Sequence, residues 1–276
     1  MALQAVIDIW CKIQVIHYGE LMGKKYLAPS VKKAFDIMRI ISKSKDGIGL
    51  NEIARSLGIA KSTVHGITSI LEEVGAVERE PVTKRYELGM ALFELGRRAY
   101  SKMEIRQIAR PFMEELMEKA QESVFLGTLS GDHSAIMVLD VVECEHDLKI
   151  TSPIGAILPI YAAASGKALL SVLDEKEAME IIKTKGLPKR TEKSITDPAQ
   201  FIEEIRKVRQ KGYATDYEEY IAGVRAVAAP ITVDKKHPAS IYVVGFKASL
   251  DDEKMLILKE EIKRTSESIN NSFKVH

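Results

Sequence analysis

Cysteine is nearly absent from the 276-residue sequence, which has only Cys11 and Cys144, far apart in the chain. Two such residues do not indicate a disulfide framework, so we expect a protein of a reducing compartment, the cytoplasm. The sequence also lacks a run of about 20 apolar residues, and we therefore expect no membrane span. The sequence also lacks an excess of charges of one sign. The formal net charge is +1, so any nucleic-acid binding must come from a local group of cations.

The composition, 46% hydrophobic and 29% charged residues, is typical of a soluble globular protein, and the length allows two domains. We interpret residues 1–27 as an N-terminal extension, because Asp8 and Lys12 interrupt its apolar stretch and no signal-peptide cleavage site is visible. Two hypotheses remain for this extension. It is a short amphipathic helix, or the native chain begins at Met22, because codons for the preceding Gly-Glu pair can resemble a bacterial ribosome-binding site.

Residues 28–88 carry three helical patterns and then a hairpin pattern. The first helical pattern, VKKAFDIMRIISKS, has an apolar stripe of Val31, Phe35, Met38 and Ile41 or Ile40. The second, LNEIARSL, is short, with Gly49 and Glu52 suited to its N-terminus and Gly58 to its C-terminus. The third ends at Gly75. Its expected apolar stripe consists of Val64, Ile67, Ile70, Leu71 and Val74.

The rest of the chain predicts a hairpin, a linker and an α/β domain. AVEREPVTKRYELG alternates apolar and polar residues around a loop at residues 81–84, so residues 28–88 as a whole indicate a winged helix-turn-helix domain. We expect a linker helix over residues 89–102, and a break or kink of the helical pattern near Pro111. In residues 103–276, strand patterns joined by tight turns alternate with helices, which predicts an α/β domain with a largely antiparallel sheet. The fold class is therefore a two-domain α+β protein.

The third helix presents a polar face once its apolar stripe is assigned to the core. Together with the hairpin loop, this face supplies our candidate DNA-binding residues: Lys61, Ser62, Thr63, His65, Gly66, Ser69, Lys84 and Arg85. Small polar residues near a helix N-terminus suit contacts to phosphates and base edges in a major groove. The solvated side of an amphipathic helix is the simpler explanation for an isolated helix, but the preceding short helix and the following hairpin favour DNA recognition.

The net positive charge of the winged-helix region is small. Residues 28–98 hold 12 Lys and Arg against 9 Asp and Glu, which would give a single domain little affinity for DNA. A dimer that reads two half-sites is therefore expected.

Other motifs that could bind a ligand or catalyse a reaction are less specific. Residues 164–171, ASGKALLS, resemble a phosphate loop but have Tyr161 in place of the first glycine and Ala168 in place of Ser or Thr. A loop that enters a helix there could still bind a carboxylate through backbone N–H groups. Cys144 and His146 do not make a metal site without a second cluster, and no G-x-S-x-G nucleophile elbow is present. We therefore expect no metal, no cofactor and no enzyme.

Several motifs, in order, resemble those of the IclR family of transcriptional regulators: LNEIARSLGIAKSTVHGITSILEEVGAVERE, KRYELG, PIYAAASGKALLS, KRTEKSITD and IRKVRQKGYATDYEEYIAGVRAVAAPI. The resemblance covers residues 28–248. It implies an N-terminal winged helix for DNA binding and dimerisation, a linker helix, and a C-terminal effector domain related to GAF and profilin-like folds. Family members are dimers or pairs of dimers that bind palindromic operators as repressors or activators, and small organic acids commonly tune them.

The resemblance also implies an effector pocket lined by the GKALL segment and the last strands. Carried over to this sequence, the pocket comprises Ala164, Ser165, Asp216, Val224, Ala226, Tyr242 and Val244, to which we add Ile150 and Ile157 as an apolar wall. Some relatives have Ser on the final strand and Cys on the strand before it, where this sequence has Tyr242, Val244 and Ala226. A small hydrophilic acid loses hydrogen-bond partners there, so we expect a larger or more apolar ligand such as an aromatic carboxylate. Ordinary core packing is the alternative for Val244 and Ala226.

We therefore expect a ligand-responsive transcription factor that binds double-stranded DNA as a homodimer or a pair of dimers. The main alternative is an enzyme or sensor that acts on a small carboxylate and uses its helical part for dimerisation, and an inactive relative is a third hypothesis. Gly66 departs from the long basic residue that is common in the family. Because glycine inside a helix costs about 1 kcal/mol relative to alanine, we expect Gly66 to serve either close approach of the backbone to DNA or a different base preference at that position.

Overall fold

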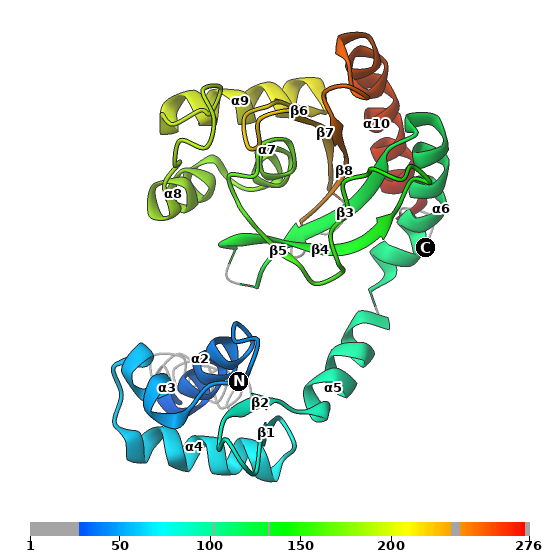
Figure 1. Ribbon diagram of the computed structural model, residues 1–276. Coiled ribbons are helices and arrows are strands. Elements are labelled where there is room, and N and C mark those ends of the chain that lie inside the picture. Colours follow the sequence, from blue (N-terminus) through cyan, green and yellow to red (C-terminus); the bar gives the residue numbers. More distant parts are fainter. Residues whose placement is uncertain (1–27, 102, 132, 233–237, 274–276) are drawn as a thin grey trace, which may run out of the picture. The chain divides into compact units, whose positions relative to one another are not determined.

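The computed structural model describes residues 28–101, 103–131, 133–232 and 238–273, and the hypotheses about residues 1–27 lie outside this part of the chain. The chain divides into two compact units, with the boundary in sequence between residues 102 and 103 (Figure 1). Each unit is described by itself. No helix of the described residues is long and apolar enough to cross a bilayer.

The first unit is a winged helix-turn-helix, as predicted. Its elements in chain order are α2 (Pro29–Ile41), α3 (Leu50–Leu57), α4 (Lys61–Glu73), β1 (Val77–Arg79), β2 (Tyr86–Leu88) and α5 (Met90–Ser101). At the start of α3 the Glu52 carboxylate accepts a hydrogen bond from the backbone N–H of Gly49, with the donor and acceptor atoms 2.8 Å apart. Gly58 and Gly75 have φ angles of 63° and 70°, so both adopt the left-handed conformation that ends a helix with little strain.

Two of the predicted apolar stripes are confirmed only in part: Ile41 on α2 and Val64 and Leu71 on α4 are buried as predicted. On α2, Ile37 and Ile41 are buried, whereas Val31 and Phe35 are more than half exposed. On α4, the buried side chains are Val64, Thr68 and Leu71. Ile70 and Val74 are exposed instead, which corrects the predicted stripe.

Thr68 is a buried polar residue whose hydroxyl is satisfied by hydrogen bonds. Its hydroxyl donates to the carbonyl oxygen of Val64 at 2.9 Å, and it lies 3.3 Å from the hydroxyl of Tyr86 on β2. This pair of hydroxyls joins the hairpin to α4. Periodicity missed the position because Thr counts as polar in a hydrophobic pattern, although a helix interior accepts a hydroxyl that bonds back to the preceding turn.

The second unit is an α/β domain with one six-stranded sheet. Its elements are α6 (Glu104–Ala120), β3 (Ser123–Leu129), β4 (Ala135–Val142), β5 (Ile157–Pro159), α7 (Ala163–Val172), α8 (Glu175–Lys185), α9 (Pro198–Lys211), β6 (Ala214–Tyr217), β7 (Val224–Ile231), β8 (Ala239–Phe246) and α10 (Asp252–Phe273). The strand order is β5-β4-β3-β8-β7-β6, and each pairing within it is antiparallel. The predicted fold class is confirmed.

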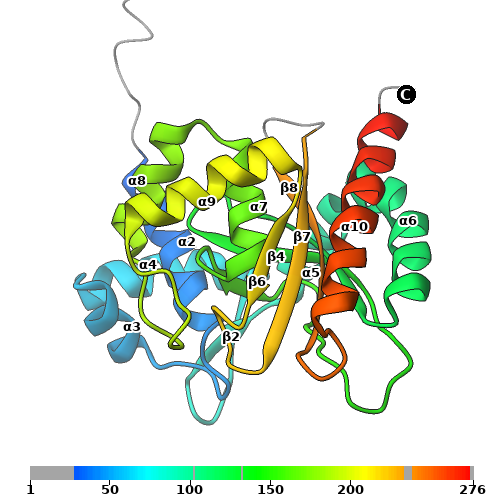
Figure 2. The same ribbon diagram turned by 90° about the horizontal axis from the view of Figure 1, so that it is seen from above.

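Helices cover both faces of this sheet. Figure 2 shows α6 and α10 on one face and α7 and α9 on the other. Because side chains alternate along a strand, neighbouring residues of β8 enter different layers: Val243 packs with α6 and α10, and Tyr242 packs on the α7 side. Of the break or kink predicted near Pro111, the break is wrong, because α6 continues through Pro111 and the helical pattern is interrupted between α5 and α6 instead; the kink stays a prediction.

Candidate functional site

The N-terminus of α4 is open to bind an anion. Ala60 at its N-cap position provides no side-chain hydrogen bond, and the first turn has no acidic residue. By contrast, Asp174 caps α8 and Asp197 caps α9 through their side chains. The first N–H groups of a helix have no partner within the helix and carry a partial positive charge, so an uncapped N-terminus suits a phosphate oxygen.

The predicted DNA-binding residues of α4 lie on one polar face. Lys61, Ser62, His65, Gly66 and Ser69 are exposed, and Thr63 is half-buried. Ser69 is partly engaged already, because its hydroxyl donates to the carbonyl oxygen of His65 at 2.9 Å. The hydroxyls of the first turn are thus more available to an external partner than that of Ser69.

The two predicted cations of the wing differ in their surroundings. Lys84 is exposed at the tip of the hairpin, with a φ of 59°. The Arg85 guanidinium is held inside the unit. Its Nε lies 3.0 Å from the carbonyl oxygens of Asp46 and Gly47, and one terminal nitrogen lies 3.3 Å from the carboxylate of Glu52. Arg85 therefore braces the wing against the start of α3, a role that sequence spacing did not indicate.

Packing does not require a glycine at position 66. A Cβ atom built on Gly66 would meet no atom within 4 Å other than its own helix backbone. We expect Gly66→Ala to raise the stability of the first unit by about 0.5–1 kcal/mol, because alanine loses less conformational entropy than glycine in a helix. Denaturant unfolding followed by helix content measures this change.

Gly58→Ala is the matched control. Gly58 also has open space around it, but its φ of 63° suits glycine and strains alanine. This substitution is expected to destabilise the unit by about 1 kcal/mol. A loss of stability for both variants would contradict the assignment of Gly66 to an unstrained, solvent-facing position.

A cavity of about 220 Å³ lies between the sheet and the N-terminus of α7 in the second unit. The β4–β5 and β6–β7 loops complete its walls. The lining residues are Phe125, Ile150, Thr151, Ser152, Leu158, Ala162, Ala164, Ser165, Asp216, Tyr220, Ile221, Val224, Ala226, Tyr242 and Val244. Most of them are apolar, so the cavity suits a compact ligand with a large hydrophobic part.

The structure brings most of the predicted effector residues together around this cavity. Those that line it are Ile150, Ala164, Ser165, Asp216, Val224, Ala226, Tyr242 and Val244. Ile157 is the exception, since its side chain is 59% exposed on β5 and does not line the cavity. Leu158 takes that place in the wall, because consecutive residues of a strand face opposite sides.

Sequence reasoning missed other lining residues, among them Phe125 and Tyr220. Phe125 pairs with Tyr242 across β3 and β8, and their rings stack with centroids 5.2 Å apart. Strand register, which the sequence does not reveal, makes them neighbours. Tyr220 belongs to the β6–β7 loop, where no periodic pattern exists to indicate direction.

The ring of Tyr242 reaches over Gly127 on β3. A Cβ at Gly127 would lie 3.1 Å from Cε1 of Tyr242, so glycine leaves room for this ring. Burial raises the pKa of the Tyr242 hydroxyl, which has no hydrogen-bond partner among the described residues. Tyr242 is therefore a neutral, largely apolar part of the wall.

The main charges beside the cavity come from three buried or half-buried groups. Asp216 is only 4% exposed, and one of its oxygens accepts a hydrogen bond from the backbone N–H of Glu219. The Lys167 ammonium lies 2.7 Å from the Glu219 carboxylate and 3.0 Å from the carbonyl oxygen of Thr215. Burial raises the pKa of Asp216 to about 7, and it also raises the pKa of Glu219, which Lys167 partly offsets.

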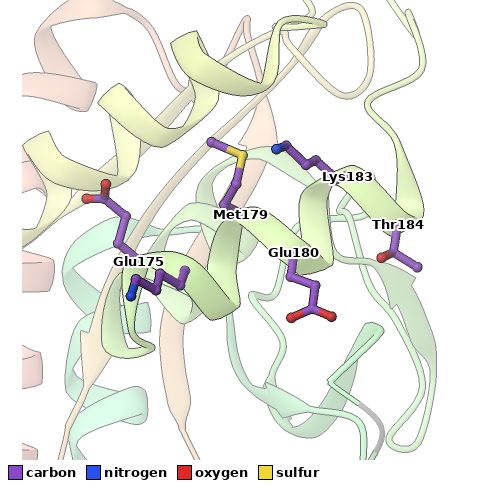
Figure 3. Close-up of a pocket in the computed structure, with 6 residues that line it drawn as sticks. Glu175, Met179, Glu180, Lys183 and Thr184 are labelled. Atoms are coloured by element: carbon purple, nitrogen blue, oxygen red, sulfur yellow. The ribbon is translucent and has the colours of Figure 1, made fainter.

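A second depression runs along α8 and has a different character. Figure 3 shows its side chains projecting from the helix surface, among them Glu175, Met179 and Lys183. The Glu175 carboxylate is already bound by Arg206, 2.6 Å away. Four of its six lining residues are charged and the depression is open to solvent, so it lacks the enclosure that a small ligand needs.

Both units of the chain match domains of the same family of known proteins. Residues 97–271 match the model of the bacterial transcriptional regulator IclR C-terminal domain, and residues 30–81 match that of the IclR helix-turn-helix domain. The transcriptional repressor IclR of Escherichia coli is 28% identical over 82% of this chain and 83% of its own length.

Solved structures agree with the sequence matches. The crystal structure of the Thermotoga maritima IclR is 31% identical, with a TM-score of 0.62 over 90% of this chain and 99% of that chain. An IclR homolog from Microbacterium hydrocarbonoxydans, solved in complex with 4-hydroxybenzoate, shares the fold at 22% identity, with a TM-score of 0.71 over 90% of this chain and all of that chain, 100%. With both domain models matched in order along one chain, this protein belongs to the IclR family of ligand-responsive, DNA-binding transcriptional regulators.

Proposed function

We propose that this protein is a homodimeric regulator that binds a palindromic operator through α4 and responds to an aromatic carboxylic acid in the cavity beside α7. It acts in the cytoplasm and carries out no reaction on the acid. The observation that carries the proposal is the cavity itself, which is apolar along most of its wall and has the N-terminus of α7 at one edge.

The first unit supports DNA binding through the geometry of α4. Its uncapped N-terminus places Ser62 and Thr63 where phosphate oxygens can meet both backbone N–H groups and hydroxyls. His65 and Gly66 follow on the same face and would lie against base edges when the helix enters a major groove. Lys84 at the wing tip would add a phosphate contact.

Exposed apolar side chains support a dimer. The first unit leaves several large apolar residues in solvent on α2 and α5: Val31, Phe35, Met90, Phe93 and Leu95. Val31 and Phe35 are four residues apart on α2, and Met90 and Phe93 are three apart on α5, so each pair shares one face of its helix. Large apolar side chains that share an exposed face are costly in water and are typical of a protein interface. We propose that a second copy covers these helices, which would also place two α4 helices on two half-sites. Analytical ultracentrifugation separates a dimer from a pair of dimers.

The cavity supports a single-ring acid. A cavity of roughly 150 Å³ is enough to hold a benzene ring, so the 220 Å³ available here leaves room for a ring with a carboxylate. Phe125 and Leu158 would contact the ring, and the N–H groups near Ala164 and Ser165 would bind the carboxylate. The Microbacterium hydrocarbonoxydans homolog was solved with 4-hydroxybenzoate, an acid of this class.

Fluorescence anisotropy with labelled DNA from upstream of the protein's own gene tests the proposal. We expect 4-hydroxybenzoate or benzoate to change the affinity for this DNA by about tenfold, within the range typical of allosteric coupling. Glyoxylate should have little effect, and the aromatic acid should be recovered unchanged. A larger response to glyoxylate, or turnover of the acid without any DNA affinity, would contradict the proposal.

Ala226→Leu provides the variant for the same assay. Ala226 lies on the cavity floor, and a larger side chain there would occupy the space of the ring. We expect this variant to bind DNA normally but to lose its response to the aromatic acid. Ala199→Leu, a change of equal size at an exposed position of α9 in the second unit, should keep the response.

A further inference from the structure

Asp216 places a carboxylate in the wall of the cavity where the proposed acid ligand would bind. No Lys, Arg or His is among the described residues that line the cavity. The nearby cation is Lys167, and its ammonium is already engaged by Glu219 at 2.7 Å and by the carbonyl oxygen of Thr215 at 3.0 Å. If all three groups were ionised, Asp216, Glu219 and Lys167 would together hold one uncompensated negative charge.

Within the described part of the chain, the other elements around Asp216 add no cation to the cavity wall. Their titratable or polar groups are Ser165 on α7, Thr151 and Ser152 in the β4–β5 loop, Tyr220 in the β6–β7 loop and Tyr242 on β8. On β7 the lining side chains, Val224 and Ala226, are apolar. On α9, the Glu204 carboxylate adds a negative charge that raises the pKa of Glu219, and the nearby Lys207 ammonium is engaged by Glu204 at 2.7 Å.

An anionic ligand therefore meets a second carboxylate in a poorly solvated place. Two carboxylates in such a site repel one another strongly, and the usual outcome is that one proton is retained between them. Asp216 is the group that would retain this proton, because burial raises its pKa to about 7 even in the ligand-free protein. A neighbouring anion raises it further.

We propose that this protein binds its carboxylate effector together with one proton, which Asp216 holds and donates as a hydrogen bond to the ligand carboxylate. The inference rests on the proposed binding of an aromatic acid in this cavity. In thermodynamic terms the cavity recognises the undissociated acid, although the acid in solution is almost entirely ionised near neutral pH. The regulator would thus report acid concentration and acidity together.

The expected pH dependence follows from linkage. Below about pH 6, Asp216 is protonated before the ligand arrives, and affinity for the ionised acid is constant. Above about pH 7, each binding event must take up a proton, so affinity falls by up to about tenfold per pH unit. Between pH 6 and pH 8 we expect the dissociation constant of benzoate to rise by about tenfold.

Isothermal titration calorimetry of the full-length protein with benzoate tests the proposal. Benzoate has a single titrating group, which stays ionised over the whole range. Titrations at pH 8 in buffers of different ionisation enthalpy should show uptake of nearly one proton per ligand, and uptake at pH 6 should be close to zero. Asp216→Asn, which keeps the shape and can still donate a hydrogen bond, should bind with a dissociation constant that does not change with pH.

Glu260→Gln is the matched control, since Glu260 is an exposed carboxylate on α10. It should retain both proton uptake and the pH dependence. If Asp216 only supports the β6–β7 loop, Asp216→Asn will weaken binding equally at each pH and keep the slope, which overturns the inference. Binding by the unsubstituted protein without pH dependence also overturns it and leaves the aromatic-acid proposal standing. Absence of benzoate and 4-hydroxybenzoate binding at every pH removes the proposed effector class and the inference with it.

Discussion

Replacement of Ser62 and Thr63 by glutamate is expected to lower the affinity for operator DNA by about 100-fold or more. Each hydroxyl near a phosphate contributes a hydrogen bond of about 1 kcal/mol, and a carboxylate in its place repels the phosphate. A dimer carries the change twice. A combined loss of roughly 3 kcal/mol already corresponds to about 100-fold in the dissociation constant. Fluorescence anisotropy at fixed salt concentration measures the effect.

The same variant should fold normally. The first turn of α4 has no acidic residue, and carboxylates at this end of a helix are stabilising because they interact with its partial positive charge. Circular dichroism and thermal unfolding are therefore expected to show equal or higher stability. Loss of DNA binding then reports on the interface and not on folding.

A control with the same charge change is available in the second unit. Thr184 on α8 and Ser268 on α10 are both exposed, so Thr184→Glu combined with Ser268→Glu adds the same two carboxylates elsewhere. This control should bind DNA within about threefold of the unsubstituted protein. If it loses as much affinity as the α4 variant, overall charge and not the α4 surface governs binding.

Lys167→Met is expected to destabilise the second unit by about 3 kcal/mol at pH 8. The Lys167 side chain is only 2% exposed, and its ammonium neutralises Glu219 close to Asp216. Removing one member of a buried ion pair leaves an uncompensated charge, which typically costs 3–5 kcal/mol. We take the lower end because the Glu219 side chain keeps 17% of its surface in contact with solvent.

The loss should shrink as pH falls. Without Lys167, the Asp216 and Glu219 carboxylates would have folded-state pKa values above those of the unfolded chain, so their ionisation opposes folding at pH 8. Protonation relieves this cost, and the difference from the unsubstituted protein should decrease between pH 8 and pH 5. Hydrogen exchange of the β7 and β8 amides reports on this unit separately from the first one.

Lys183→Met on α8 is the control for this substitution, because Lys183 is an exposed lysine (Figure 3). It should change stability by less than about 0.5 kcal/mol. A loss for Lys167→Met that does not depend on pH would indicate that packing of the lysine stem, and not its charge, stabilises the unit.

The local features of the first unit could be predicted because they depend on neighbours in the sequence. Gly49, Glu52 and Gly58 mark the ends of α3 through capping and backbone conformation, which act over a few residues. The phase of the stripes on α2 and α4 could not be predicted in full. Phe35 and Ile70 are as apolar as the residues that are buried, and only packing decides which of them remain in solvent.

The cavity depended on two kinds of information. Family resemblance brought most of its predicted residues to the right wall, because homologous positions keep their place in a fold. The prediction was wrong at Ile157, which we added to the family positions as an apolar wall: a one-residue difference in strand position turns its side chain outward and puts Leu158 in the wall. Phe125 was missed because its contact with Tyr242 depends on the register between β3 and β8.

The sequence by itself determined the winged helix, the order of elements in the α/β domain and the family, since periodicity, caps and ordered motifs are all properties of residues near one another in the chain. Tertiary structure alone decided that Lys167 would pair with Glu219 and that Asp216 would face a cavity with no Lys, Arg or His among its described lining residues. Lys167 lies 52 residues before Glu219 in the sequence, and the energies of the three groups depend on burial and on short distances between charges. The charge of the cavity wall, and with it the pH dependence proposed for effector binding, is therefore a property of the fold.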